Sequence, residues 1–144
     1  MNKISLSKFD KGDVEFVLNN FAMFFKNPTA EQVEKRIEAW RDGLGFCINC
    51  DGQKVGLITL SEKQSKTLSF GIMILRQFRG RGIAKQAFDL AAAEAKSKGY
   101  TTILSSCAKS NQASIHMHQK IGFDLIKQEI NAAGNEVCRW QKSI

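Results

Sequence analysis

Proline, histidine and long apolar runs are scarce in this chain of 144 residues. It contains one proline, Pro28, and two histidines. The scarcity of proline argues against long disordered linkers, because such segments are typically rich in it. No apolar run approaches the roughly 20 residues that a membrane-spanning helix needs. The first ten residues hold no apolar stretch like that of a secretory signal peptide, so we expect a cytoplasmic protein with no membrane partner.

Cysteine is also sparse, and its spacing does not indicate a metal site. Cys47 and Cys50 form a C-x-x-C pair, but a structural zinc site normally needs a second pair of ligands, and Cys107 and Cys138 are isolated. A thioredoxin-like motif would open a helix, whereas here an Asp-Gly hairpin-turn signal follows. We therefore expect ordinary strand cysteines, with Cys47 and Cys50 pointing to opposite faces of a sheet, no metal and no disulfide.

The charge is positive but is not concentrated as in a nucleic-acid-binding protein. The chain has 21 basic and 14 acidic residues and a formal net charge of +7. Its densest basic group comprises Arg76, Arg79, Arg81 and Lys85, and no helix-turn-helix, zinc-finger or RNA-binding signature accompanies it. A solvated basic surface and a bound anionic ligand explain the charge, so we expect no nucleic-acid partner.

Length and patterning predict a single α/β domain over residues 1–144. Hydrophobic periodicity gives the order β-α-α-β-β-β-α-β-α-β-β. The expected strands are residues 1–8, 46–49, 55–60, 67–75, 101–107, 123–130 and 136–141, and the expected helices are residues 10–25, 29–43, 82–99 and 111–121. The strands within 46–75 form an antiparallel meander, and the helix at 82–99 then crosses over to a parallel strand.

The strand that ends near Leu75 runs into a glycine-rich turn that opens the next helix. Glycine lets a ligand approach the backbone closely, because it has no Cβ. The first turn of a helix also presents N–H groups without internal partners and the positive end of the helix dipole. Residues 80–85 are therefore predicted to cradle a phosphate or pyrophosphate. The turn fits neither the dinucleotide fingerprint nor the P-loop, and a plain helix start with glycines for packing explains it equally well.

The sequence Arg79-Gly80-Arg81-Gly82-Ile83-Ala84 fits the pattern R/Q-x-x-G-x-G/A. It resembles the coenzyme A loop of the GNAT family of N-acetyltransferases. Gln77 to Gly82 fits the same pattern in an earlier frame, but the junction between strand and helix favours the later one.

A second stretch, residues 111–123, resembles the GNAT segment N-x-x-A-x-x-x-Y-x-K-x-G-F. It matches at Asn111, Lys120, Gly122 and Phe123, with Ser114 in place of alanine and His118 in place of tyrosine. It begins 29 residues after Gly82, about one helix and one strand later. The resemblance covers the chain from about Cys47 to Trp140, and the order and spacing of the two motifs make it specific.

The resemblance implies the GNAT fold, also called the acyl-CoA N-acyltransferase fold. This is a mixed, mostly antiparallel central sheet of six to seven strands with helices on both faces. It also implies acetyl-CoA as co-substrate, without a metal. Backbone groups of residues 72–74 would hold the pantetheine arm like an extra strand and supply an N–H to the oxyanion. The cofactor-binding residues implied in this way are Ile72, Met73, Ile74, Arg79, Gly80, Arg81, Gly82, Ile83, Ala84, Lys85, Asn111 and Ser114.

The catalytic groups are less clear, because several familiar residues are replaced. The tyrosine of the family protonates the coenzyme A thiolate, and His118, at that position, can donate a proton near neutral pH but is shorter. His118 is therefore the predicted catalytic residue, with a polar wall residue as the alternative. The glutamates that serve as bases in relatives are replaced by Ser69 and Ser106. One remaining candidate for the base is Glu62, acting through a water molecule. Cys107 is a candidate nucleophile, although a lone strand cysteine is usually inert.

The resemblance implies transfer of an acetyl group from acetyl-CoA to a primary amine by direct attack in a ternary complex. The acceptor is left open between a small amine, an amino acid or antibiotic, and a protein N-terminus. Four aromatic residues either line an acceptor wall or, as helical spacing favours, pack on the sheet: Phe21, Phe24, Phe25 and Trp40. The rival interpretation is a non-catalytic acyl-CoA-binding or regulatory module. Family members are often homodimers, so the resemblance makes a homodimer possible, and the sequence leaves the oligomeric state open.

Overall fold

The computed structural model describes residues 3–21 and 28–144. Within these residues the elements follow the order that the sequence predicts. The strands are β1 (Ile4–Lys8), β2 (Leu44–Cys50), β3 (Gln53–Gln64), β4 (Thr67–Ile74), β5 (Thr102–Ala108), β6 (Asp124–Ile130) and β7 (Glu136–Ser143), and the helices are α1 (Asp13–Phe21), α2 (Ala30–Asp42), α3 (Ile83–Ser97) and α4 (Gln112–Ile121). Among the described helices, none is long and apolar enough to cross a bilayer.

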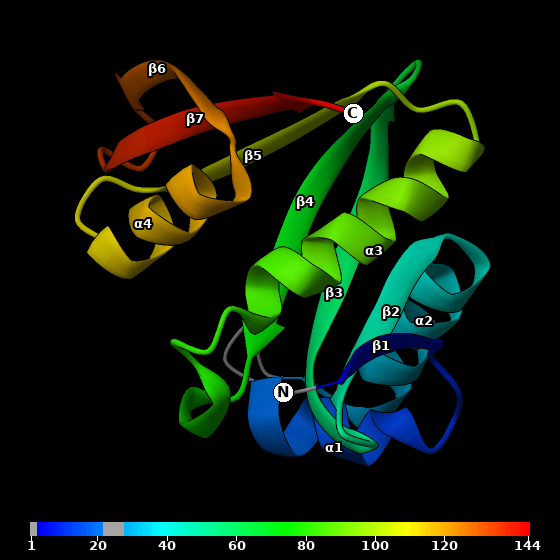
Figure 1. Ribbon diagram of the computed structural model, residues 1–144. Helices are drawn as coiled ribbons and strands as arrows, with labels where there is room; N and C mark the ends of the chain where they lie inside the picture. Colours follow the sequence, from blue (N-terminus) through cyan, green and yellow to red (C-terminus); the bar gives the residue numbers. More distant parts are fainter. Residues whose placement is uncertain (1–2, 22–27) are drawn as a thin grey trace.

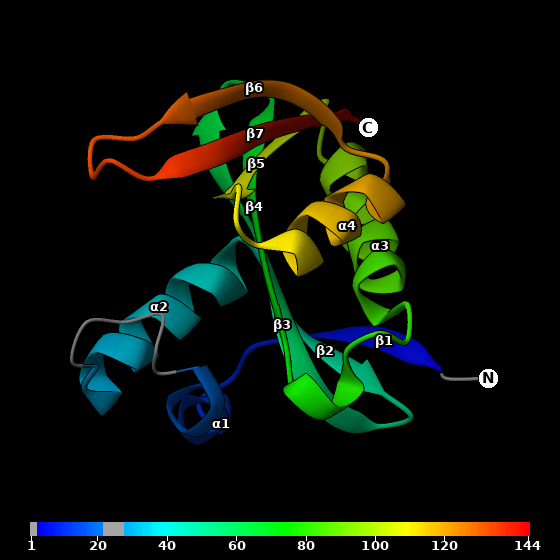
Figure 2. The ribbon, with the colours of Figure 1, turned by 90° about the vertical axis from the view of Figure 1, so that its left-hand side faces the viewer.

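The strands form one seven-stranded sheet in the order β1-β2-β3-β4-β5-β7-β6. Every neighbouring pair is antiparallel except β4 and β5, which are parallel. Helix α3 makes the crossover between these two strands, as predicted. Figures 1 and 2 show α1 and α2 on one face of the sheet and α3 and α4 on the other. The expected fold class, a mixed and mostly antiparallel sheet with helices on both faces, is confirmed.

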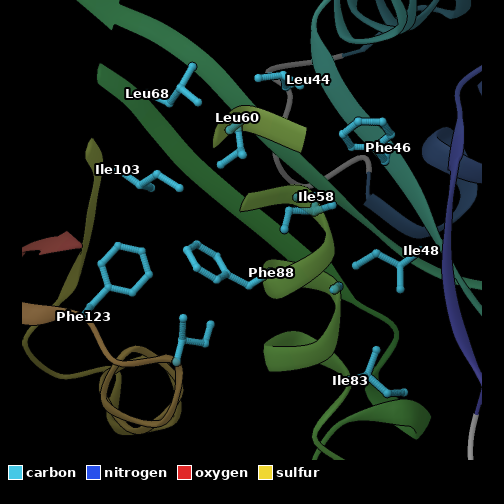
Figure 3. Close-up of a cluster of buried hydrophobic side chains, with 14 of the residues drawn as sticks. Leu44, Phe46, Ile48, Ile58, Leu60, Leu68, Ile83, Phe88, Ile103 and Phe123 are labelled. Atoms are coloured by element: carbon cyan, nitrogen blue, oxygen red, sulfur yellow. The ribbon is translucent and has the colours of Figure 1, made fainter. Parts of the chain in front are cut away.

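Each face of the sheet buries its own apolar cluster. The larger cluster lies under α3 and α4, where Phe88 and Phe123 approach Ile58 and Ile103 of the sheet (Figure 3). The smaller cluster lies under α1 and α2 and contains Cys47, whereas Cys50 belongs to the larger one. The prediction that these two cysteines point to opposite faces is therefore confirmed. Burial, reinforced by the Asp13 carboxylate, raises the pKa of the Cys47 thiol to about 12, so this thiol is unreactive at neutral pH.

Two predicted helix caps are present with their side-chain hydrogen bonds. Thr29 Oγ1 accepts from the backbone of Gln32, and Gln32 Oε1 accepts from the backbone of Thr29, which is a complete capping box at the start of α2. Asn111 Oδ1 accepts from the backbone N–H of Ser114, 3.0 Å away, and so caps α4. These local signals fix where the helices begin.

Three details differ from the sequence prediction. Strand β3 continues to Gln64 instead of ending at Leu60, because its pairing with β4 carries polar residues that show no apolar alternation. A 3-10 turn at Arg76–Phe78 separates β4 from the glycine turn. Strand β2 begins at Leu44, two residues before the expected start at residue 46. The prediction that the first helix extends to Phe25 falls on residues outside those described.

Candidate functional site

Strands β4 and β5 pair over three positions and then diverge. The parallel ladder joins Thr67 to Thr102, the next residues to each other, and Ser69 to Leu104. On its other edge β4 stays paired with β3 as far as Ile74, opposite Gly56. From residue 70 to residue 74, β4 therefore keeps one unpaired edge, and its N–H and C=O groups on that edge can bind an extended ligand. Of the predicted segment, Ile72 and Ile74 turn their backbone groups to this edge, whereas those of Met73 face β3. The carbonyl of Ile74 accepts from Arg79 Nε.

The backbone of β4 at this edge is set by a close approach from β3. A Cβ on Gly56 would lie 2.2 Å from the carbonyl oxygen of Met73. Only glycine fits at residue 56, so the two strands come together closely where β4 presents its unpaired edge. No motif around Gly56 had indicated this role.

The glycine turn leads from this edge to the start of α3. Gly80 and Gly82 have φ of 77° and 76°, in the left-handed region that favours glycine, and a Cβ at either position would meet open space. The first helical bond runs from Gln86 N–H to the carbonyl of Gly82, so Ile83, Ala84 and Lys85 have no acceptor within the helix. These N–H groups and the helix dipole are the features that the predicted anion cradle at residues 80–85 requires.

The predicted cations of this turn already have partners within the chain. Arg79 donates from Nε to the carbonyl of Ile74 at 2.9 Å, which ties the turn to the end of β4. The guanidinium of Arg81 lies 5.3 Å from the centre of the Phe78 ring. Lys85 pairs with Asp89 one turn along α3 at 2.9 Å, and both side chains are about half exposed. The positive charge surrounds the cradle, while the backbone supplies its donors.

His118 lies beside the point where β4 and β5 part, but it is buried. Its side chain is 2% exposed, and its ring stacks on Trp140 with 5.1 Å between ring centres and 13° between planes. Phe70 and Phe123 contact it edge-on. Helical spacing puts His118 on the same face as the polar residues Asn111 and Ser114, yet His118 and Ile121 are the buried residues of α4 and Ala113 is exposed.

The hydrogen bonds of His118 fix its protonation state. Nδ1 lies 2.7 Å from the carbonyl oxygen of Ser114, which can only accept, so Nδ1 carries the proton. Nε2 lies 2.7 Å from Oγ of Ser105 and accepts from that hydroxyl in the neutral ring. Burial lowers the pKa of His118 below its ordinary value near 6.5, and the Ser114 carbonyl opposes part of that shift. The imidazole is thus neutral at pH 7, and Ser105 connects it to the sheet.

A hollow of about 290 Å³ opens where the two strands part. Its lining comprises Ser69 and Phe70 of β4, residues 104–106 of β5, Arg139 and Trp140 of β7, Lys63 of β3, and residues 126, 127 and 129 of β6, and we call this cavity the splay hollow. Figure 2 shows the β6–β7 hairpin arching over the parting strands. Ser105 pairs with Trp140, and Ser106 pairs with Arg139. Because side chains alternate along a strand, the Ser105 hydroxyl faces His118, whereas Ser106 and Arg139 face the opposite side of the sheet. Ser105 thus lines the hollow where the strands part, with its hydroxyl turned to His118.

Charged side chains of the splay hollow come from strand irregularities. Lys63 is the extra residue of a β-bulge between Glu62 and Gln64, opposite β4. A second bulge follows Leu125 on β6 and precedes Lys127. Neither these residues nor Ser105 and Arg139 were singled out from the sequence, because single charged or hydroxyl residues on a strand carry no motif.

The remaining residues singled out from the sequence either lie away from the splay hollow or make structural contacts. Asn111 serves as the cap of α4, and Ser114 Oγ lies 3.4 Å from His118 Nδ1. Glu62 is exposed opposite Leu68 and does not line the splay hollow. Cys107 accepts a hydrogen bond from Trp140 Nε1 at 3.3 Å, which suits a packed residue.

Two of the four predicted wall aromatics can be placed. Phe21 is buried in the smaller cluster, and Trp40 packs against that cluster and lies 5.2 Å from the Phe9 ring. Both therefore pack on the sheet, as their helical spacing favours. Phe24 and Phe25 lie outside the described residues.

Comparison with known proteins places this geometry in context. A family model described as "Acetyltransferase (GNAT) family" matches residues 14–123. Spermidine N(1)-acetyltransferase of Escherichia coli (strain K12) is 31% identical over 87 residues, a match that covers 56% of this chain and 45% of the relative. The chain thus spans about half the length of the curated relatives it matches.

Solved structures share the fold along nearly the whole chain. An N-acetyltransferase from Staphylococcus aureus Mu50 superposes with a TM-score of 0.82 at 23% identity, covering 99% of this chain and 98% of that one. Spermidine N-acetyltransferase from Vibrio cholerae, solved in complex with CoA and spermine, gives 0.81 at 19% identity and covers 97% and 95%. At these identities the likeness shows the fold.

Proposed function

The chain belongs to the GNAT acetyltransferase family, and from this premise we propose that it transfers an acetyl group from acetyl-CoA to a primary amine. The observation that carries the proposal is the unpaired edge of β4 at residues 70–74, which leads directly to the anion cradle at residues 80–85. An extended pantetheine chain has amide groups that suit such an edge, and its pyrophosphate suits the cradle.

The chain's own residues take distinct parts in this binding. The backbone of Ile72 and Ile74 pairs with the pantetheine amides, and an N–H of the same edge donates to the carbonyl oxygen that becomes negative during attack. The N–H groups of residues 80–85 bind the pyrophosphate, and Arg79, Arg81 and Lys85 add positive charge. The amine enters through the splay hollow and attacks directly, without a covalent enzyme intermediate.

We place Ser105 and His118 in one proton path. As the amine attacks, a nitrogen–carbon bond forms and the nitrogen becomes cationic and acidic. Ser105 Oγ takes a proton from that nitrogen and passes its own proton to His118 Nε2, 2.7 Å away. The resulting imidazolium keeps its Nδ1–H bond to the Ser114 carbonyl. When the carbon–sulfur bond breaks, the proton returns through Ser105 to the thiolate, so no glutamate base is needed.

The distinctive test of cofactor binding is a pair of glycine variants. Gly82→Glu places a carboxylate at the anion cradle, whereas Gly99→Glu makes the same change at another exposed, left-handed glycine beyond the far end of α3. We expect calorimetry to show acetyl-CoA binding in the wild type and in Gly99→Glu, and a loss of about tenfold or more in Gly82→Glu, because charge repulsion and lost contacts act together. Equal binding by both variants would contradict the proposed cradle.

The rival interpretation is a module that binds acyl-CoA without transferring the acyl group. It predicts normal binding of acetyl-CoA but no release of free CoA thiol with any amine. Appearance of an N-acetylated amine, detected by mass spectrometry, rules out this alternative. A cytoplasmic location and a homodimer stay predictions.

A further inference from the structure

We propose that the splay hollow accepts a primary amine that also carries a carboxylate or phosphate group, in preference to a polycationic amine. The inference rests on the proposed function, since it concerns the acceptor of that acetyl transfer. Its basis is the set of charges on the walls of the hollow: Lys63, Lys127 and Arg139 are positive, and Glu129 is the one carboxylate among the described lining residues.

Both oxygens of Glu129 are already engaged. Arg139 Nε lies 2.7 Å from Oε1, and Lys127 Nζ lies 2.9 Å from Oε2. These two bonds lower the pKa of Glu129, so the carboxylate is ionised at neutral pH and bound to two cations. An incoming ammonium group would have to displace one of them, which makes Glu129 a poor site for a second amine.

Arg139 still has donors to offer. Its Nε serves Glu129, and no described residue accepts from its terminal Nη groups. These two nitrogens form a planar fork that suits a carboxylate or phosphate in bidentate geometry. Glu129 holds the guanidinium in place, so little conformational freedom is lost when an anion binds.

Lys63 adds another cation to the lining of the hollow. It makes no ion pair with any described residue, and its place at a bulge leaves it outside the regular pairing of β3 with β4. Arg139 and Lys63 line the same hollow, where β4 and β5 part. An acceptor whose anionic group is bound by these cations can present its amine to the gap between the two strands.

A polycation is disfavoured here by the same charges. Two relatives carry spermidine N-acetyltransferase in their names. A polyamine entering this hollow would face three cations and a carboxylate that is already paired, and like charges at close range repel. This chain therefore shares the fold of those proteins while its acceptor wall points to a different substrate class.

The experiment compares amines that differ in one anionic group. Acetyl transfer from acetyl-CoA is measured with ornithine against putrescine, with glucosamine 6-phosphate against glucosamine, and with spermidine. We expect kcat/KM to be higher for the anionic member of at least one pair by about tenfold or more, as one charge-assisted bidentate contact allows. The pair that shows the difference identifies carboxylate or phosphate as the recognised group.

Two variants connect the preference to the named cations. Arg139→Gln and Lys63→Gln should raise KM for the anionic amine about tenfold, with KM for acetyl-CoA and activity on the paired amine that lacks the anionic group unchanged. Lys63→Gln removes no ion pair with a described residue, so we expect it to leave the stability of the fold unchanged. The control is Lys98→Gln, which makes the same change at the C-terminal cap of α3.

The outcomes separate this inference from the proposed function. Preference for spermidine or putrescine, or equal use of both members of each pair, overturns the inference alone. Transfer to no amine by a protein that binds acetyl-CoA overturns the proposed acetyl transfer and the inference with it. Failure to bind acetyl-CoA overturns the proposed function and the inference with it.

Discussion

At the scale of single residues, the surroundings of His118 decide what its ring can do. Aromatic rings enclose it, and its two nitrogens are already bonded to Ser105 and Ser114. An imidazole in this position can exchange a proton through the Ser105 hydroxyl. In the proton path that we propose, Ser105 is the group that meets the reacting amine, and His118 holds the proton behind it.

Removal of the Ser105 hydroxyl should interrupt proton transfer while leaving cofactor binding intact. We expect Ser105→Ala to lower kcat by about a hundredfold, the lower end of what positioned acid–base groups contribute, with KM for acetyl-CoA unchanged. Steady-state kinetics over a range of pH measures both constants. Ser105→Thr, which keeps a hydroxyl, should recover most of the activity, and equal loss in both variants would assign Ser105 a packing role.

The buried neutral state of His118 also predicts a pH dependence of stability. Its pKa is lowered in the folded state, so below its ordinary value near 6.5 the unfolded chain binds more protons than the folded one. The contribution of His118 is thus fully present above that value and declines as pH falls below it. Urea unfolding of wild type and His118→Gln between about pH 8 and pH 5 should show the steeper acid loss in the wild type. Parallel curves would contradict the buried neutral ring.

The sequence located His118 but not its role. A helical projection grouped it with Asn111 and Ser114 on a polar face, because neighbours from other elements are invisible to that projection. The stacking of Trp140, which comes from the last strand, turned this face toward the core. Ser105 went unnoticed for the same reason, since its partner lies 13 residues away on a helix.

At the scale of elements, one ion pair links the first helix to the sheet. Asp13 begins α1 and is 1% exposed, and its carboxylate bonds Lys54 of β3. Asp13 Oδ2 also accepts from the backbone N–H of Asp10 at 2.8 Å. Lys54 is partly exposed, so the two partners differ in how well water can replace a lost bond.

This asymmetry predicts unequal costs for the two single substitutions. Lys54→Met leaves a buried carboxylate without its cation and should destabilise the fold by about 3 kcal/mol. Asp13→Asn keeps a hydrogen-bond acceptor and leaves a lysine that water can solvate, so its cost should be about 1 kcal/mol. Urea unfolding at neutral pH measures both, with Lys35→Met in an exposed ion pair as control. The opposite ranking would contradict the inequality.

Element order, helix caps and the glycine turn could be predicted because each has a local signature in the chain. The bulges at Lys63 and before Lys127 could not, since a bulge is a property of two paired strands. The early divergence of β4 and β5 was expected from family resemblance alone. The charged wall of the splay hollow follows from these non-local features and so appeared with the structure.

At the scale of the whole molecule, the net charge of +7 is distributed between two functional regions and the general surface. Arginines and a lysine surround the anion cradle, and three further cations line the splay hollow. Both regions suit anionic ligands, which in our proposals are the cofactor at one and the acceptor at the other. Small anionic molecules would then account for the charge that first raised the question of nucleic acids.

The short ladder between β4 and β5 divides the sheet into two parts, which we call leaves. One leaf is β1–β4, the other is β5, β7 and β6, and they meet through three residue pairs and the packing of α3 against α4. A ligand seated in the wedge between them would touch both leaves at once. A bound cofactor would then limit the relative motion of the two parts of the sheet. Through that limit it would also affect the width of the splay hollow, where the proposed acceptor enters.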